Sequence, residues 1–239
     1  MTEGADADAS LALAKLANRW RLSQRQLDQL ANILSVLESS ERAPTTVREP
    51  VEAIDTHLAD SLVALDLDAV RAAQTVADMG SGAGFPGLAL AVALGECRVS
   101  LIESQDRKCA FLGRAISRAV IDNARIVCVR VEQWAEGTSA NDVVTARALG
   151  SQPVVLEYAA PLLRLGGTLV DWRGKRDEQE ERRAGVAAEE LGLRLVAIER
   201  VQPFAAARAR HLHLYEKVMD TPQRFPRRAG MARKRPLGG

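Results

Sequence analysis

The chain has 239 residues, of which 47% are hydrophobic and 26% charged, and this composition predicts one principal globular domain with a sizeable core. Its net charge of +1 excludes a protein that binds nucleic acid through a uniformly basic surface, so such a partner would need a local patch. Because no apolar run approaches the ~20 residues of a membrane-spanning helix and no signal peptide is recognisable, we expect a cytoplasmic protein that binds no membrane.

Residues 1–9 are acidic and are expected to be disordered, whereas residues 10–72 should form a helical extension packed on the main domain. Ser23 and Gln26 have the spacing of a capping box, which predicts a helix that starts at Ser23. The leucines of this helix recur every three or four residues, and the resulting apolar stripe indicates burial against a larger body.

A further helix is expected to open at Pro50 and to run to residue 65. His57 and Asp60 are three residues apart in this helix and therefore share one face. That face is either simply solvated or part of a functional site. Its closeness in sequence to the glycine-rich segment that follows is the observation in favour of a site.

The segment from Val76 to Gly87 reads VADMGSGAGFPG, which predicts a strand, a tight glycine turn and the start of a helix. Glycines allow positive φ angles and leave main-chain N–H groups open to a ligand at the helix entry. A second strand ends at Glu103, 23 residues after Gly80, where nucleotide-binding α/β folds place an acid on ribose hydroxyls. Turn and acid together indicate a cofactor that contains a nucleoside.

Two cofactors fit this segment. Gly82, Gly84 and Gly87 have the G-x-G-x-x-G spacing of dinucleotide-binding proteins, which would make the chain a nicotinamide-dependent oxidoreductase. The D-x-G-x-G string that starts at Asp78 is instead typical of S-adenosylmethionine-dependent methyltransferases. A turn that only packs a helix against a strand is the third interpretation, and the spacing alone does not decide among them.

Strands and helices alternate from the glycine turn onward, which predicts a parallel sheet with helical crossovers. One of these helices is expected over residues 153–166. The strands at 193–201 and 210–218 are joined by a short segment and should pair antiparallel. Because a parallel sheet closed by an antiparallel last strand is usual in methyltransferases, residues 73–220 are expected to form an α/β, Rossmann-like methyltransferase domain.

Other chemistries have less support. Cys97, Cys109 and Cys128 are scattered and odd in number, which predicts reduced thiols in the core. His211 and His213 point to the same side of the last strand, but without a third ligand a structural role is favoured over a metal site. The acidic residues show no paired-carboxylate or nucleophile–base spacing, so a hydrolase is set aside.

Residues 221–239 form a basic tail with six lysines or arginines and no acid. As an isolated segment it should be disordered and solvated. Beside a parallel-sheet active site it would instead neutralise the phosphates of a nucleic acid, or it would fold back and complete a cofactor site.

The order of several segments resembles the bacterial 16S rRNA guanine-N7 methyltransferase family, also known as glucose-inhibited division protein B. The resemblance is carried by TVREPVEAIDTHLADSL, DMGSGAGFPGL, ESQDRKCAFL, VRVEQW, DVVTARAL, LLRLGGTLV, WRGK and FPRRAGMARKRPL. It covers nearly the whole chain from Leu22. It implies an S-adenosylmethionine-dependent enzyme that methylates N7 of a guanine in 16S rRNA of the small ribosomal subunit. We also expect a monomer.

The resemblance implies site residues as well. Cofactor contacts are expected from Gly80, Ser81, Gly82, Gly84, Phe85, Glu103, Val131, Glu132 and Arg147. RNA contacts are expected from His57, Lys108, Arg130, Arg227, Arg228 and Lys234. Glu103 would hold the ribose, and Val131 and Glu132 would flank the adenine. No metal and no general base are expected, because guanine N7 carries a free lone pair and attacks a methyl group without first losing a proton.

The chain departs from the family pattern in three places. Ala43 and Pro44 stand where the family has Asn and Leu, Arg173 replaces a frequent lysine, and Met231 and Ala232 replace a frequent Thr-Pro. None of these positions is an expected cofactor contact. The differences therefore concern the N-terminal helical extension and the RNA contacts.

Overall fold

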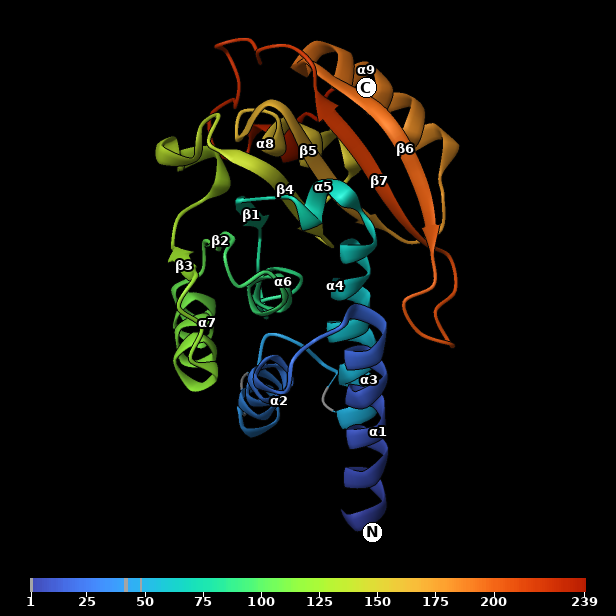
Figure 1. Ribbon diagram of the computed structural model, residues 1–239. Helices are drawn as coiled ribbons and strands as arrows, with labels where there is room; N and C mark the ends of the chain where they lie inside the picture. Colours follow the sequence, from blue (N-terminus) through green and yellow to red (C-terminus); the bar gives the residue numbers. More distant parts are fainter. Residues whose placement is uncertain (1, 41–42, 48) are drawn as a thin grey trace.

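The computed structural model describes residues 2–40, 43–47 and 49–239 and shows a central sheet with helices on both faces (Figure 1). Within these residues the sheet has seven strands in the order β3-β2-β1-β4-β5-β7-β6. The strands are β1 (Thr75–Met79), β2 (Arg98–Ile102), β3 (Ala124–Val127), β4 (Asn141–Arg147), β5 (Leu163–Arg173), β6 (Leu193–Val201) and β7 (Arg210–Lys217). β1 to β5 are parallel, and β7 lies antiparallel between β5 and β6. The predicted α/β, Rossmann-like architecture with an antiparallel last strand is confirmed.

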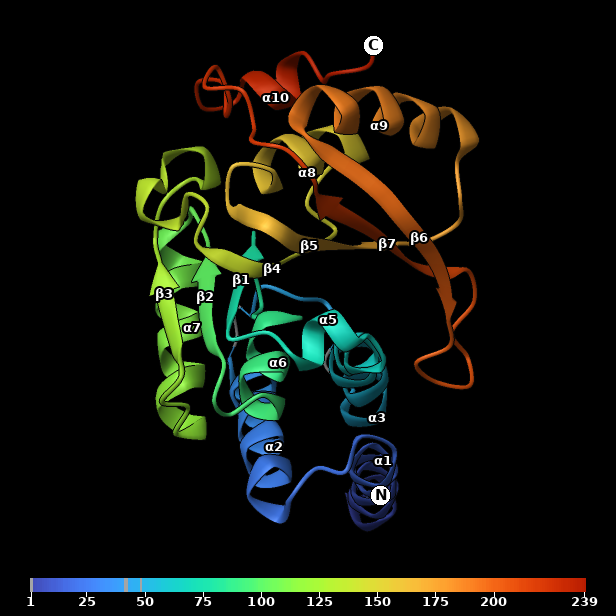
Figure 2. The same cartoon turned by 45° about the horizontal axis from the view of Figure 1, so that its top comes forward.

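The helices cover the two faces of the sheet as separate groups (Figure 2). α6 (Gly87–Ala93), α7 (Asp106–Ala119) and the N-terminal helices form one core, and α8 (Gln152–Ala159), α9 (Glu178–Leu191) and α10 (Met231–Lys234) form the other. Successive residues of β1 point to opposite faces: Val76 belongs to the first core, and Ala77 to the second. The sheet is therefore covered on both sides, as a parallel sheet requires.

The N-terminal extension packs against α6 and α7. It consists of α1 (Thr2–Trp20), α2 (Gln24–Ser39), α3 (Pro50–Ala53), a π-helical segment η1 (Ile54–Ala59), α4 (Asp60–Leu62), a 3₁₀ segment η2 (Val63–Asp66) and α5 (Asp68–Arg71). The predicted capping box is confirmed, because the Ser23 N–H donates to Gln26 Oε1 at 2.8 Å and the Gln26 N–H donates to Ser23 Oγ at 3.3 Å. The Gln26 side-chain amide also donates to the Val92 carbonyl oxygen at 2.9 Å, which ties α2 to α6.

The first helix begins earlier than predicted. α1 starts at Thr2, so residues 2–9 are helical although their acidic composition predicted disorder. Alanines alternate with the acids there, and negative charge near a helix N-terminus is favourable. The predictions also touch residues outside the described part of the chain, namely Met1, Glu41, Arg42 and Arg48.

Two other boundaries differ from the prediction. α8 ends at Ala159 and not at residue 166, because Pro161 lacks a backbone donor and Leu163 already pairs with Asn141 in the sheet. The basic tail is ordered in the structure, and Phe225 joins the core beneath it. The charge of the tail predicted a solvated segment, but a buried apolar residue within it packs it against the core.

Cys109 and Cys128 form a disulfide, which contradicts the prediction of three reduced thiols. Cys109 lies in the first turns of α7 and Cys128 directly follows β3, and these neighbouring elements bring the two Cα atoms to 6.0 Å. The two cysteines are 19 positions apart in the sequence, so a search for C-x-x-C pairs does not find them. Cys97 is a buried free thiol, as predicted.

Among the described residues, none of the helices combines the length and the apolar character needed to cross a bilayer. In the same part of the chain, no cluster of three or more His, Cys, Asp or Glu side chains is arranged to hold a metal ion. The two histidines of β7 have protein partners instead. His213 Nδ1 lies 2.7 Å from Gln152 Nε2, and His211 Nδ1 lies 2.8 Å from the Gly174 carbonyl oxygen.

Candidate active site

Two cavities adjoin at the carboxyl ends of the parallel strands. The first, called the Glu103 cavity, has a volume of about 560 Å³ and lies between the glycine turn, the end of β2 and the 3₁₀ segment η3 (Val131–Gln133). The second, called the Arg147 cavity, has a volume of about 410 Å³ and lies between η1 and the ends of β4 and β5. Ala148 and Leu149 line both cavities, so these residues form a shared wall.

The glycine turn requires residues without side chains. Gly80 has a φ of +68°, and a Cβ placed on it would lie 2.5 Å from Leu149 Cδ1. Gly84 has a φ of +96°, and a Cβ there would lie 2.2 Å from Leu88 Cδ1. Because both the backbone angle and the space exclude a larger residue, Gly80 presents bare main chain to the Glu103 cavity.

Asp78 and Ser81 support the turn from inside the protein. The Asp78 carboxylate accepts a hydrogen bond from the Thr145 hydroxyl at 2.8 Å and one from the Gly87 N–H at 3.2 Å. Burial raises the pKa of Asp78. The Ser81 hydroxyl donates to the Asp78 carbonyl oxygen at 3.0 Å, so the side chain of this predicted cofactor residue is used within the turn.

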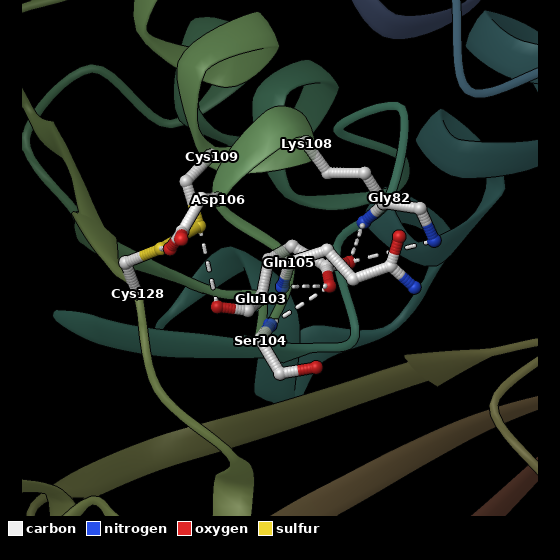
Figure 3. Close-up of a disulfide and its surroundings, with 8 residues drawn as sticks. All are labelled: Gly82, Glu103, Ser104, Gln105, Asp106, Lys108, Cys109 and Cys128. Carbon is white, nitrogen blue, oxygen red and sulfur yellow. Dashed lines mark hydrogen bonds and ion pairs between the residues drawn. A yellow bond between two sulfur atoms is a disulfide. The ribbon is translucent and has the colours of Figure 1, made fainter.

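Glu103 follows β2, and main-chain donors hold its carboxylate (Figure 3). Oε2 accepts from the Gly82 N–H at 3.1 Å, and Oε1 accepts from the N–H groups of Ser104 and Gln105 at 2.7 and 2.9 Å. Lys108 Nζ stands 3.9 Å from Oε2. Each carboxylate oxygen has two lone pairs, and Oε1 already accepts two hydrogen bonds, so Oε2 is the oxygen that can still accept one from a ligand.

The disulfide lies beside Glu103 and joins two walls of its cavity (Figure 3). Cys109 Sγ lies 3.3 Å from the Glu103 carbonyl oxygen, and Cys128 Sγ lies 3.6 Å from Asp106 Oδ1. Residues 129–132 follow Cys128 directly and form the opposite wall of the cavity. The covalent link therefore fixes the Glu103 side of the cavity to the side expected to hold the adenine.

Arg147 ends β4 and is held by acceptors of the N-terminal extension. Its Nη1 donates to the Thr56 carbonyl oxygen at 3.0 Å and to Asp60 Oδ2 at 2.9 Å. The other oxygen of the buried Asp60 carboxylate lies 3.3 Å from Arg210 Nε. Trp172 Nε1 donates to the Asp60 carbonyl oxygen at 2.7 Å, which fixes this helix against β5. One buried carboxylate thus lies between two guanidinium groups.

His57 stacks on Phe85 at the Arg147 cavity, with ring centroids 4.9 Å apart and an interplanar angle of 5°. The Arg147 guanidinium lies 5.9 Å from the centre of the Phe85 ring. Burial, and then the charge of Arg147, lower the pKa of His57 to about 4. His57 is therefore uncharged at neutral pH, so its expected RNA contact would be made through an aromatic face and not through charge.

Asp171 and Arg173 form the wall of the Arg147 cavity at the end of β5. Arg173 Nε donates to Asp171 Oδ2 at 2.7 Å, and Arg173 Nη1 donates to the Gly150 carbonyl oxygen at 3.0 Å. Burial raises the pKa of Asp171 to about 7, although Arg173 opposes the shift. Arg173, which stands at the place of the family lysine, thus links β5 to the loop after β4.

The structure divides the predicted site residues between the two cavities. The Glu103 cavity is lined by Gly80, Glu103, Val131 and Glu132, and by Lys108 and Arg130, which were expected to contact RNA. His57 and Arg147 line the Arg147 cavity. Neither cavity is lined by Ser81, Gly82, Gly84 or Phe85. Arg228 and Lys234 are exposed on the tail, whereas Arg227 pairs with the buried Glu157 and is not free to bind phosphate.

Sequence reasoning missed several residues of the cavities. Leu149, Tyr158 and Arg233 line the Glu103 cavity, and Asp171 and Trp172 line the Arg147 cavity. The signal that could have found Leu149, Asp171 and Trp172 is their place at the carboxyl ends of predicted parallel strands, where ligands of such sheets bind. Tyr158 and Arg233 carry no comparable signal.

Comparison with known proteins gives the family. A family model described as rRNA small subunit methyltransferase G matches residues 23–212. A relative from Rubrobacter xylanophilus named Ribosomal RNA small subunit methyltransferase G is 39% identical over 226 residues, which cover 92% of this chain and 87% of the relative. A relative of the same name from Syntrophomonas wolfei is 40% identical over 190 residues, which cover 79% of this chain and 87% of the relative.

Solved structures of low sequence identity share the fold. Cofactor-bound Rv0187 from MTB aligns with a TM-score of 0.54 at 21% identity and covers 79% of this chain and 89% of that chain. Aeropyrum pernix fibrillarin with natively bound S-adenosyl-L-methionine aligns with a TM-score of 0.54 at 15% identity, covering 66% and 72%. The relatives named above do not favour the nicotinamide-dependent oxidoreductase that the glycine spacing left open. With the family model over residues 23–212 and these relatives across most of its length, the chain belongs to the rRNA small subunit methyltransferase G family.

Proposed function

We propose that this chain transfers the methyl group of S-adenosylmethionine to N7 of a guanine in 16S rRNA. The observation that carries the proposal is the meeting of two cavities at Leu149, one with a glycine turn and a fixed carboxylate, the other with a guanidinium group. A methyl donor in the first cavity and a base in the second would meet where the two cavities join, beside Ala148 and Leu149. Family membership supports rRNA as the substrate.

The residues of the Glu103 cavity fit a nucleoside cofactor. Gly80 lets Leu149 pack directly on the turn, since a Cβ there would lie 2.5 Å from Leu149 Cδ1, and Gly80 itself lines the cavity. Oε2 of Glu103 would accept a hydrogen bond from a ribose hydroxyl, and Val131 and Glu132 would flank the adenine. When bound, S-adenosylmethionine supplies an electrophilic methyl group on a cationic sulfur.

The Arg147 cavity fits the requirements of the acceptor. Guanine N7 has a lone pair in the base plane, so the protein needs to place the base in line with the methyl group and needs no general base. Positioning of this kind contributes about 7–11 kcal/mol to lowering a barrier. His57, whose ring stacks on the buried Phe85, lines this cavity, and Arg147 would donate to guanine O6.

The ion pairs of this cavity suit a product that carries a positive charge. N7-methylation makes the guanine ring cationic, and a free guanidinium group beside it would repel it. Asp60 accepts from Arg147 at 2.9 Å and lies 3.3 Å from Arg210, so this one carboxylate offsets part of the charge of the two guanidinium groups. Asp60 would therefore weaken the repulsion between these guanidinium groups and the methylated base.

The RNA would have to present its guanine outside a helix, because the major-groove edge of A-form RNA is inaccessible to side chains. Base flipping or a single-stranded target would meet this requirement. The exposed cations Arg228 and Lys234 would contact phosphates on the tail side of the site. We further propose that the protein acts in the cytoplasm and as a monomer.

A methyl-transfer assay tests the proposal. The purified protein is incubated with S-adenosylmethionine labelled on its methyl group and with naked 16S rRNA, 30S subunits or 70S ribosomes. Labelled rRNA is then treated with borohydride and aniline, which cleaves at N7-methylguanine, and the cleavage site is mapped by primer extension. We expect label at one guanine in at least one of the three substrates.

The controls separate the competing functions. Equilibrium binding of S-adenosylmethionine and of NAD is measured on the same preparation. NAD affinity without S-adenosylmethionine affinity would overturn the assignment of the Glu103 cavity. If the protein binds S-adenosylmethionine and RNA but transfers no methyl group at saturating cofactor, it would be an RNA-binding protein and not a methyltransferase.

A further inference from the structure

The basic tail packs on the second core instead of extending into solvent. Figure 2 shows α10 near α8, and Arg233 of α10 lines the Glu103 cavity. Phe225 and Ala232 are buried among residues of α8 and α9. One buried apolar residue therefore holds each end of the segment 225–232, and the cations between them are brought to defined places.

One of these cations is locked to a buried acid of α8. Glu157 is 1% exposed, and its carboxylate accepts hydrogen bonds from Arg227 Nε at 2.8 Å, from Arg227 Nη2 and from the Arg227 N–H at 3.2 Å. Arg227 Nη2 also donates to the Arg235 carbonyl oxygen at 2.8 Å, across the short α10 helix. A bidentate pair with this many supporting bonds fixes the geometry of a segment, and removal of one partner leaves a buried charge without compensation.

The segment held by this pair reaches the Glu103 cavity at two points. The Gly230 N–H donates to Glu132 Oε1 at 2.9 Å, and Glu132 is expected to flank the adenine. Arg233 Nη2 donates to the Leu149 carbonyl oxygen at 2.9 Å, and Arg233 itself lines the cavity. Leu149 in turn lies over Gly80 of the glycine turn, where a Cβ would meet it at 2.5 Å.

We propose that Arg227 is a positioning residue for the cofactor site: its pair with Glu157 places Gly230 and Arg233 so that the tail completes the adenine side of the Glu103 cavity. The inference rests on the proposed function, since it takes the cavity as the S-adenosylmethionine site. It assigns opposite roles to two adjacent arginines. Arg227, held by Glu157, acts on the cofactor site by placing Gly230 and Arg233. The exposed Arg228 is expected to contact the RNA.

The two arginines give a matched pair of variants. Arg227→Ala should weaken S-adenosylmethionine binding by at least about tenfold, which corresponds to about 1.4 kcal/mol. It should raise KM for the cofactor without changing KM for RNA. Arg228→Ala should leave cofactor affinity unchanged and should lower the dependence of RNA affinity on salt by about one unit of log K against log salt. Arg227→Lys, which keeps the charge but loses the bidentate geometry, should recover cofactor affinity in part.

Arg233→Ala tests the same inference if the Arg227 variant does not fold. Arg233 is exposed, so its truncation should not affect folding, yet it removes the bond to the Leu149 carbonyl oxygen. It should weaken cofactor binding several-fold. All affinities are measured by calorimetry at a temperature well below the thermal midpoint of each variant, with circular dichroism as the check on folding.

The outcomes separate this inference from the proposed function. If the unmodified protein fails to bind S-adenosylmethionine, the proposed function is wrong and the inference falls with it. If the unmodified protein binds while folded Arg227→Ala and Arg233→Ala bind equally well, only the inference is overturned. A loss of RNA affinity in Arg227→Ala equal to that in Arg228→Ala, with cofactor affinity intact, would show that the tail acts solely as a phosphate-binding arm.

Discussion

The two cavities adjoin, yet different forces hold their functional groups. In the Glu103 cavity, main-chain N–H groups bind the carboxylate at 2.7–3.1 Å, and the glycine turn packs directly against Leu149. In the Arg147 cavity, side chains pair with one another, with the buried Asp60 between the partly exposed Arg147 and Arg210. Main-chain donors have little freedom to rearrange, whereas ion-paired side chains can exchange partners. The expected site of the methyl donor is thus fixed before the cofactor binds. The expected site of the guanine can adapt to the RNA.

The largest effect should come from the covalent link that flanks only the Glu103 cavity. The disulfide between Cys109 and Cys128 spans 19 positions, and replacement of both residues by serine should lower the free energy of unfolding by about 3 kcal/mol. Denaturant titration of the oxidised protein and the double serine variant measures the difference. A reductant should destabilise the parent and leave the variant unchanged. Equal midpoints in oxidised and reduced parent would show that the link contributes nothing.

Glu103→Ala tests the fixed carboxylate of the same cavity. The substitution removes the expected ribose contact and leaves the N–H groups of Gly82, Ser104 and Gln105 without their acceptor. We expect S-adenosylmethionine affinity to fall by about 30-fold, near 2 kcal/mol, as for a hydrogen bond to a charged group. Isothermal calorimetry gives the affinity, and Glu136→Ala, which truncates an acid 80% exposed, is the control. Unchanged affinity would refute the ribose assignment.

Arg147→Ala should separate the two cavities functionally. Its guanidinium group contacts Asp60 and Thr56 and lines only the Arg147 cavity. We expect kcat/KM for rRNA to fall by about tenfold while S-adenosylmethionine affinity stays within twofold of the parent, because one hydrogen bond to the base contributes about 1.4 kcal/mol. Single-turnover methyl transfer and calorimetry provide both readouts. Loss of cofactor affinity in this variant would instead place Arg147 in the donor site.

The smallest effect should be the pH dependence that buried His57 gives to stability. Its folded-state pKa is lowered to about 4 from 6.5, so the unfolded chain binds a proton first as the pH falls. The contribution is therefore fully present above pH 6.5 and is lost as the pH falls toward 4, with about 1 kcal/mol lost by pH 5.5. His57→Phe keeps a ring against Phe85 without a titrating group, so its stability should fall less between pH 7.5 and 5.5 in denaturant titrations. An equal fall in both proteins would contradict the buried, neutral ring.

The sequence predicted the parts of the molecule that depend on local patterns. The capping box at Ser23, the glycine turn, the position of Glu103 and the antiparallel last strand were all predicted and confirmed. Each depends on neighbours within a few residues or on alternation along one segment. The end of α8 was predicted wrongly because Pro161 and the pairing of Leu163 with Asn141 outweigh the apolar run that continues past them.

The remaining features depend on tertiary contacts that no local pattern reveals. Cys109 and Cys128 meet because α7 and β3 are neighbours, and Arg227 meets Glu157 across 70 positions of sequence. The charge of the tail predicted an RNA contact for Arg227, but the buried partner on α8 could not be seen from sequence. The division of the site into two cavities was equally hidden, since Leu149 becomes a wall only once β4 lies beside β1.

The place of β7 in the sheet has a consequence for synthesis and truncation. β6 precedes β7 in the chain but is joined to the rest of the sheet only through it, so until Lys217 has been made the edge of β5 has no partner. An unpaired strand edge of this length invites association with another chain. A nascent protein stalled before residue 210 should therefore be prone to aggregate, and a shortened protein remains soluble only if it keeps β7 whole. Lys217, whose ammonium group donates to the Ala160 carbonyl oxygen at 2.6 Å, is the last residue of this strand.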